Sequence, residues 1–241
     1  MTTRTIQTSP QVYARIGGIL YLIIIVVGAL GQIFVRGTLI VSGDAASTAS
    51  NVMASQSLWR IGIAGDIMMH VFDIPLILIL YLLLKPVNKN LALLAVLFNL
   101  IQTAVLVANK LVLLIPLSLL GNADYLKAFE PSQLYALAYL LVKAHEYSFG
   151  IGLIFFGFVL LIQGYLLFRS GYFPKTLGVL MAIAGLSYLT NSFTLILAPV
   201  YAGTIFPVLV LALIGELSLS LWLIVKGVNV AKWEERALES A

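Results

Sequence analysis

Charged and titratable side chains inside long apolar stretches are the residues that could carry chemistry in this 241-residue sequence. Each of them costs about 2.5 to 3.5 kcal/mol to place at the centre of a membrane. Asp66, His70 and Asp73 follow one another at i, i+4 and i+7, so a helix would carry all three on one stripe. The spacing therefore predicts an intramembrane polar cluster. The other candidates for this cluster are Asn109, Lys110, His145, Glu146 and Glu216.

The charge balance of the candidates indicates which ligand they could hold. The ionisable groups that could share one pocket are four carboxylates and two lysines: Asp66, Asp73, Glu146, Glu216, Lys110 and Lys143. If all were ionised, the site would lack two positive charges, so it should bind a cation, protonate a carboxylate or hold charged histidines. Our leading hypothesis is a small transporter or sensor whose interior binds a cation or relays protons. The carboxylates would accept the cation or proton, His70 would titrate, and Lys110 would supply the counter-charge.

A metal or haem site is one alternative. His70 and His145 lie in different apolar stretches at similar depth, and both could ligate a divalent ion or a haem. Asp66 or Glu146 would complete the metal shell, and the protein would then be an intramembrane enzyme whose metal activates water. No phosphate-binding loop or nucleophile motif is present. The sequence therefore specifies no cofactor and favours a protein without catalytic activity.

A purely structural role is the other alternative. Lys110 could form a buried pair with a carboxylate on a neighbouring helix and thereby set the register of the two helices. Lys143 and Glu146 could lie at the membrane surface, where long side chains reach water. Under this hypothesis the protein is a non-catalytic membrane component, and its polar residues only hold helices together.

Composition places these residues in a membrane protein. Hydrophobic residues make up 61% of the chain and charged residues only 10%, against roughly 25% charged residues in soluble domains. The absence of cysteine excludes disulfides and thiolate metal sites. The net charge of +4 comes from short segments beside the apolar runs, where basic residues set membrane orientation. We therefore expect the lipid bilayer, with a cation or proton, to be the partner, and no nucleic acid.

Six apolar runs are long enough to cross a bilayer as helices. The expected spans are residues 16–35, 61–84, 90–120, 134–168, 176–198 and 205–225. In the connections, Asp44 is expected to cap a short helix and Trp59 to anchor the chain at the membrane–water interface. The charged segment 232–239 should lie on the surface as an amphipathic helix. The predicted fold class is an all-α integral membrane protein, with residues 1–241 as a single transmembrane helical domain.

The distribution of basic residues predicts the orientation of the spans. One set of connections carries most of them: Arg4, Arg15, Lys85, Lys89, Arg169, Lys175, Lys226, Lys232 and Arg236. The opposite set carries only Arg36, Arg60 and Lys127. Basic connections stay on the cytoplasmic side, so both termini should be cytoplasmic in a cell membrane. Nothing in the apolar faces indicates an oligomeric state, because faces that contact lipid and faces that contact protein are alike in composition.

Several short segments carry a resemblance to a known family. They include Ala14-Arg15-Ile16-Gly17-Gly18, Gly43-Asp44-Ala45-Ala46, Leu84-Lys85-Pro86-Val87-Asn88, Ala144-His145-Glu146-Tyr147, Phe155-Phe156-Gly157, Gly164-Tyr165-Leu166-Leu167-Phe168-Arg169-Ser170-Gly171-Tyr172 and Gly215-Glu216-Leu217. In the order and the residues of these segments, the chain resembles a bacterial inner-membrane family of integral membrane proteins that is called domain of unknown function 4386. The resemblance covers almost the whole chain. The resemblance implies a helical, multi-pass membrane protein and implies no activity.

Overall fold

The computed structural model describes residues 9–240, which are almost entirely helical. Six helical segments are long and apolar enough to cross a membrane. They are Pro10–Leu39, Gln56–Leu84, Lys89–Leu119, Pro131–Arg169, Lys175–Leu197 and Pro199–Val225. The predicted class, an all-α protein of six spans, is confirmed. The described part of the chain contains no strand.

Each span consists of one or more helical elements. The first span contains α1 (Pro10–Leu30), the π-helical turn η1 (Gly31–Arg36) and α2 (Gly37–Leu39). The next elements are α3 (Ala45–Ala54), α4 (Gln56–Leu84), α5 (Lys89–Ala108), α6 (Lys110–Leu119), η2 (Asp124–Ala128), α7 (Pro131–Arg169) and α8 (Lys175–Leu197). The last are η3 (Pro199–Tyr201), α9 (Ala202–Ile205), η4 (Phe206–Val208), α10 (Leu209–Val225) and α11 (Val230–Glu239).

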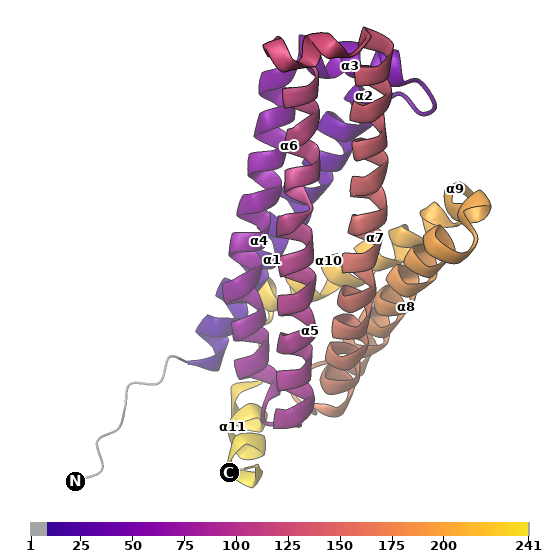
Figure 1. The fold of residues 1–241 in the computed structure, drawn as a ribbon. Coiled ribbons are helices and arrows are strands. Elements are labelled where there is room, and N and C mark those ends of the chain that lie inside the picture. The colour runs from indigo at the N-terminus through magenta and orange to yellow at the C-terminus, as the bar shows by residue number, and fades with distance from the viewer. Residues whose placement is uncertain (1–8, 241) are drawn as a thin grey trace.

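The spans close into a ring. Around it, α1 packs on α4, α4 on α5, α5 and α6 on α7, α7 on α8, α8 on α10, and α10 on α1. The beginning of α1 and the C-terminal α11 lie at one end of the ring, which we call the terminal end (Figure 1). Helix α3 lies at the opposite end, the α3 end, where α8 leans away from α7 (Figure 1). Because the number of spans is even, both ends of the described chain lie on the same side.

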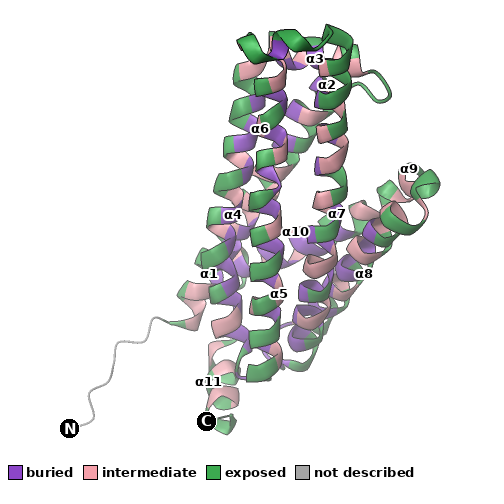
Figure 2. Ribbon diagram, in the orientation of Figure 1, coloured by how far each residue is buried: buried purple, intermediate pink, exposed green. Residues whose placement is uncertain are grey.

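Polar and apolar residues are arranged for lipid rather than water. Many large hydrophobic side chains are exposed on the outside of the ring, whereas buried residues line its inner faces (Figure 2). The buried polar residues include Asp66, His70, Asp73, Asn99, Thr103, Asn109, Lys110, His145 and Glu216. An exposed apolar surface is stable in hydrocarbon, and polar groups there must find partners inside the protein. This arrangement fits a multi-pass membrane protein.

Local signals account for several helix ends, and one prediction is wrong. Pro10 occupies the first turn of α1 behind a Ser9 cap. Asp44 caps α3 as expected, because its side chain accepts a 2.9 Å hydrogen bond from the Ser47 amide. Trp59 is not an exposed anchor at the membrane–water interface: it is 1% exposed, and its Nε1 donates to the Leu113 carbonyl oxygen on α6 at 2.9 Å. Trp59 therefore joins the third span to the second.

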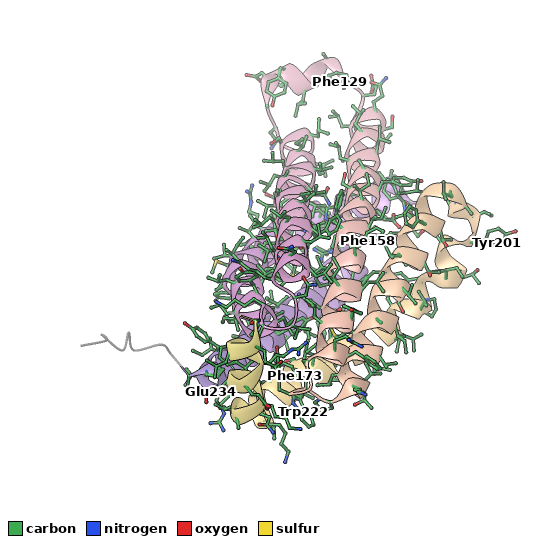
Figure 3. The ribbon with its side chains drawn as sticks, turned by 90° about the horizontal axis from the view of Figure 1, so that it is seen from below. Phe129, Phe158, Phe173, Tyr201, Trp222 and Glu234 are labelled. Carbon is green, nitrogen blue, oxygen red and sulfur yellow. The ribbon has the colours of Figure 1, made fainter. Side chains whose placement is uncertain are left out.

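The terminal end is tied together by hydrogen bonds to helix ends. The Leu83 carbonyl oxygen near the end of α4 accepts from the Tyr172 hydroxyl at 2.7 Å and from Trp233 Nε1 at 3.0 Å. Burial raises the pKa of Tyr172, which keeps its hydroxyl a donor. Viewed from this end, Phe173 and Trp222 lie beside the C-terminal helix (Figure 3). These contacts hold α11 against the bundle.

Helices α7 and α8 touch backbone to backbone along a seam of glycines. A Cβ atom added to Gly178 would lie 2.6 Å from both the Gly164 carbonyl oxygen and the Phe168 amide nitrogen. A Cβ atom on Gly185 would lie 2.7 Å from the Gly157 carbonyl oxygen. Small residues at such spacing allow helices in membranes to approach closely. We call these four glycines the α7–α8 seam.

Candidate functional site

The interior polar residues include an ion-pair cluster formed by Arg36, Asp66 and Lys110, which we call the charge node. Asp66 Oδ2 lies 2.6 Å from Arg36 Nη1 and 2.9 Å from Lys110 Nζ. The Asp66 side chain is 1% exposed, that of Lys110 3%, and that of Arg36 11%. One carboxylate thus faces two cations. When all three groups are ionised, the charge node carries one net positive charge inside the bundle.

Two histidines and an asparagine surround the charge node. Lys110 Nζ is 3.5 Å from His145 Nε2, and Asn109 Nδ2 donates to the His145 carbonyl oxygen at 3.0 Å. His70 follows Asp66 by one turn of α4 and lies within electrostatic range of Asp66 and Lys110. His70 Nε2 and Asn109 Oδ1 are buried, and neither has a hydrogen-bond partner among the described residues. Such unsatisfied groups are rare in interiors and point to a missing partner.

Helix interruptions coincide with the charge node. The π-helical turn η1 ends at Arg36, and α5 gives way to α6 at Asn109. Pro75 removes one backbone hydrogen bond from α4 in the turn after His70. Gly31 leaves room for the ion pair, because a Cβ atom there would lie 3.0 Å from Asp66 Oδ1. Irregular backbone at membrane depth is typical of functional sites.

Asp73 forms a second polar centre with side chains of α5. The Thr103 hydroxyl donates to Asp73 Oδ2 at 2.7 Å, and Asn99 Nδ2 donates to the same oxygen at 2.8 Å. Both donors are neutral, and within residues 9–240 no basic side chain forms an ion pair with Asp73. Asp73 is therefore a buried carboxyl group without a counter-charge.

Glu216 forms a third polar centre with Tyr21 of α1 and Tyr188 of α8. The Tyr188 hydroxyl donates to Glu216 Oε1 at 2.6 Å, and the Tyr21 hydroxyl donates to Oε2 at 3.0 Å. Asp73 lies within electrostatic range of both Tyr21 and Glu216. Tyr21 thus stands near both Asp73 and Glu216, and the second and third centres are neighbours.

Glu146 lies apart from the other predicted residues. Its carboxylate forms a 2.9 Å ion pair with Lys143, and both side chains are about half exposed. The neighbouring His145 points inward to the charge node, so consecutive residues of α7 face different surroundings. Within the part of the chain that the structure describes, no three His, Asp or Glu residues gather where they could hold a metal ion.

Sequence reasoning missed Arg36 and the partners of the buried carboxyl groups. Arg36 was assigned to the connection after the first span, although the apolar pattern continues through Leu39, Ile40 and Val41. That continuation, with no turn residue before Ser42-Gly43, is the signal that could have placed Arg36 inside the span. Tyr21 and Tyr188 gave no comparable signal, because tyrosine within an apolar run is usually part of the core or of the membrane interface.

Comparisons with known proteins give a family and no activity. Residues 16–227 match a family described as "Domain of unknown function (DUF4386)". A relative described as an uncharacterized protein of Archaeoglobus fulgidus is 28% identical over 165 residues, which are 68% of this chain and 83% of the relative. No solved structure matches the chain.

Proposed function

Because the chain belongs to the DUF4386 family, whose description names no activity, we propose a function from its interior: the protein is a small membrane transporter that relays protons. Asp73 and Glu216 bind the proton in transit. The charge node, which lies nearer the start of α4 than Asp73 does, responds to their protonation. The membrane is the cell membrane, and the terminal end, which carries most of the basic connections, faces the cytoplasm.

The observation that carries this proposal is the type of partner at the two carboxyl groups. Asp73 is held by a hydroxyl and an amide, and Glu216 by two tyrosine hydroxyls. A carboxylate buried without a counter-charge is costly, so the protonated form competes with the ionised one. A hydroxyl can donate to a carboxylate or accept from a carboxylic acid, so the same partners serve both forms. Ionisable groups of this kind inside spans mark proton pathways.

The arrangement along α4 supports coupling between the proton centres and the charge node. Asp66, His70 and Asp73 share one stripe, and at 1.5 Å per residue Asp66 and Asp73 lie about 10 Å apart along the helix axis. His70 stands between them with an unsatisfied Nε2. A change of charge at Asp73 therefore alters the electrostatic energy of the Arg36–Asp66 contact, because the distance is short and little solvent lies between the two.

The test is proton flux into liposomes that contain the purified protein. A potassium diffusion potential, negative inside, drives protons inward, and an enclosed pH dye reports acidification. We expect wild-type protein to acidify the lumen faster than protein-free liposomes. We expect the protein-dependent rate to fall at least about tenfold in Asp73→Asn and in Glu216→Gln, since a tenfold change corresponds to only 1.4 kcal/mol. The matched control is Glu146→Gln, which removes a carboxylate from the surface and should keep the wild-type rate.

Infrared spectroscopy provides a second readout that needs no transport. The C=O stretch of a protonated carboxyl group should appear as pH is lowered and should lose one component in Asp73→Asn and another in Glu216→Gln. Equal flux in wild type and both variants, together with unchanged infrared spectra, would refute proton binding at these residues. Glu146→Gln should keep both of these components, which would show that they arise from interior and not from surface carboxyl groups.

A further inference from the structure

We propose that the charge node binds a small monovalent anion, such as a halide or a short carboxylate, at Arg36 and Lys110, with His70, one turn beyond Asp66 on α4, as a further donor. This site lies apart from the proton centres at Asp73 and Glu216. It does not rest on the proposed proton transport, since its ligand and its assay are different and neither Asp73 nor Glu216 takes part in it.

The first argument is charge. Asp66 is shared by Arg36 and Lys110, and their contacts of 2.6 and 2.9 Å leave one positive charge uncompensated at the charge node. Burying an unpaired charge costs several kcal/mol, and a bound anion removes that cost by making the site neutral. The charge count made from sequence reached the opposite sign, because it omitted Arg36 and counted Asp73 and Glu216 in the same pocket. Glu146 and Lys143, which that count also included, form a surface pair and cancel each other.

The second argument is the supply of hydrogen-bond donors. The Lys110 ammonium has three donors, of which one reaches Asp66 and another lies at 3.5 Å from His145 Nε2. Arg36 Nη2 makes only a 3.5 Å contact with Asp66, so its protons remain available. His70 Nε2, in a side chain only 3% exposed, has no partner in the described chain and can donate to an anion. A hydrated anion would also bring a water for the unsatisfied Asn109 Oδ1.

The third argument is depth, which selects a free anion over a lipid phosphate. His70 is the midpoint of α4 (Gln56–Leu84), so Asp66 lies about 6 Å from the middle toward the α3 end. In a ~30 Å hydrocarbon core centred on α4, Asp66 is then about 9 Å below the nearer boundary. Lipid phosphates lie outside that boundary. Arg36, the most exposed member of the charge node, is where an anion from the α3 side would enter.

A purely structural ion pair makes a different prediction for Asp66→Asn. If the charge node only fixes the register of the helices, Asp66→Asn removes the ion pairs that hold this register and has no effect on anion binding, because no anion binds. If the charge node is an anion site, Asp66→Asn removes a competing negative charge and leaves two cations facing the ligand. Anion affinity should then rise in Asp66→Asn and fall in Arg36→Gln and Lys110→Met.

The experiment is equilibrium binding of radioactive chloride and radioactive acetate to the purified, detergent-solubilised protein. Ionic strength is held constant with a bulky sulfonate salt. We expect saturable binding of one anion per chain, with chloride and acetate competing. Affinity should fall at least tenfold in Arg36→Gln and Lys110→Met and rise severalfold in Asp66→Asn. Lys143→Met is the matched control, because it removes an exposed lysine that neighbours Glu146, and it should bind as wild type does.

Folding of each variant is checked by gel filtration and helical circular dichroism. If Lys110→Met does not fold, Arg36→Gln and Asp66→Asn still decide the question, because they predict changes of opposite sign. The proposal is overturned if wild-type protein binds neither anion saturably, or if Arg36→Gln binds with wild-type affinity. It is also overturned if Asp66→Asn weakens binding. None of these results would bear on proton flux in Asp73→Asn or Glu216→Gln.

Discussion

Replacing Gly178 by alanine tests how closely α7 and α8 pack. A Cβ atom at Gly178 would lie 2.6 Å from two backbone atoms of α7, the Gly164 carbonyl oxygen and the Phe168 amide nitrogen. Ordinary van der Waals contact begins at about 3.4 Å, so the two helices would have to separate by almost 1 Å at the seam. Neither atom belongs to a flexible side chain. The strain can therefore be relieved only by moving whole helices.

The size of the effect follows from a matched pair of substitutions. Gly65→Ala is the control, since a Cβ atom on Gly65 would meet only Val27 Cγ1 at an ordinary 3.5 Å. Both substitutions gain the same helix propensity, about 1 kcal/mol for alanine over glycine. Their difference is then the steric cost alone, which is about 2 kcal/mol for overpacking that cannot relax locally. For a chain of this size that is roughly 4–8 °C in unfolding temperature.

The assay is thermal unfolding in detergent, followed by the loss of the monodisperse peak in gel filtration. We expect Gly178→Ala to unfold at a lower temperature than Gly65→Ala by that margin. Equal unfolding temperatures for the two variants would show that α7 and α8 are not in backbone contact. A higher unfolding temperature for Gly178→Ala would refute the argument altogether.

Two further predictions concern the α3 end. Trp59→Phe keeps an aromatic ring but removes the hydrogen bond to the Leu113 carbonyl oxygen, so it should cost about 1 kcal/mol, measured by thermal unfolding against wild type. The hydrogen bonds from Ser47 hold the pKa of Asp44 below its ordinary value, so the cap contributes above pH ~3.9 and is lost as pH falls through the lowered pKa. Carboxyl NMR should therefore place the Asp44 midpoint below ~3.9, and Ser47→Ala should raise it. A midpoint that Ser47→Ala leaves unchanged would exclude this hydrogen bond as the cause.

The helices could be predicted from sequence because their signals are local. Apolar length determines the number of spans, and Asp44 caps α3 through the hydrogen bond that its residue type favours. The stripe of Asp66, His70 and Asp73 was correctly placed on one helix, since it depends only on helical periodicity. Even the structural alternative, a buried pair for Lys110, corresponds to a contact with Asp66 in the structure.

The lateral partners could not be predicted, because they depend on which helices become neighbours. Apolar faces that meet lipid and apolar faces that meet protein look alike, so nothing local indicated that α8 and α1 both reach Glu216. Trp59 was predicted to lie at the membrane surface for the same reason: its residue type fits both positions. The sequence left open whether these residues share one pocket, whereas the structure gives the charge node, Asp73 and Glu216 different hydrogen-bonding and ion-pair partners.

The direction in which the Arg36 side chain leaves the helix axis depends on the π-helical turn Gly31–Arg36, which ends at this residue. An α-helix rotates about 100° per residue, and a π-helical turn holds an additional residue without extending the chain by a full step. If these six residues formed a regular α-helix instead, Arg36 would turn by about one residue's rotation, ~100°, around the helix axis and away from Asp66. Deleting one residue between Gly31 and Arg36 while restoring the α-helix would bring the arginine back to nearly its present direction. The charge of the node thus depends on the π-helical turn as much as on the arginine itself, so in a relative whose first span is a regular α-helix the equivalent arginine stands one position earlier.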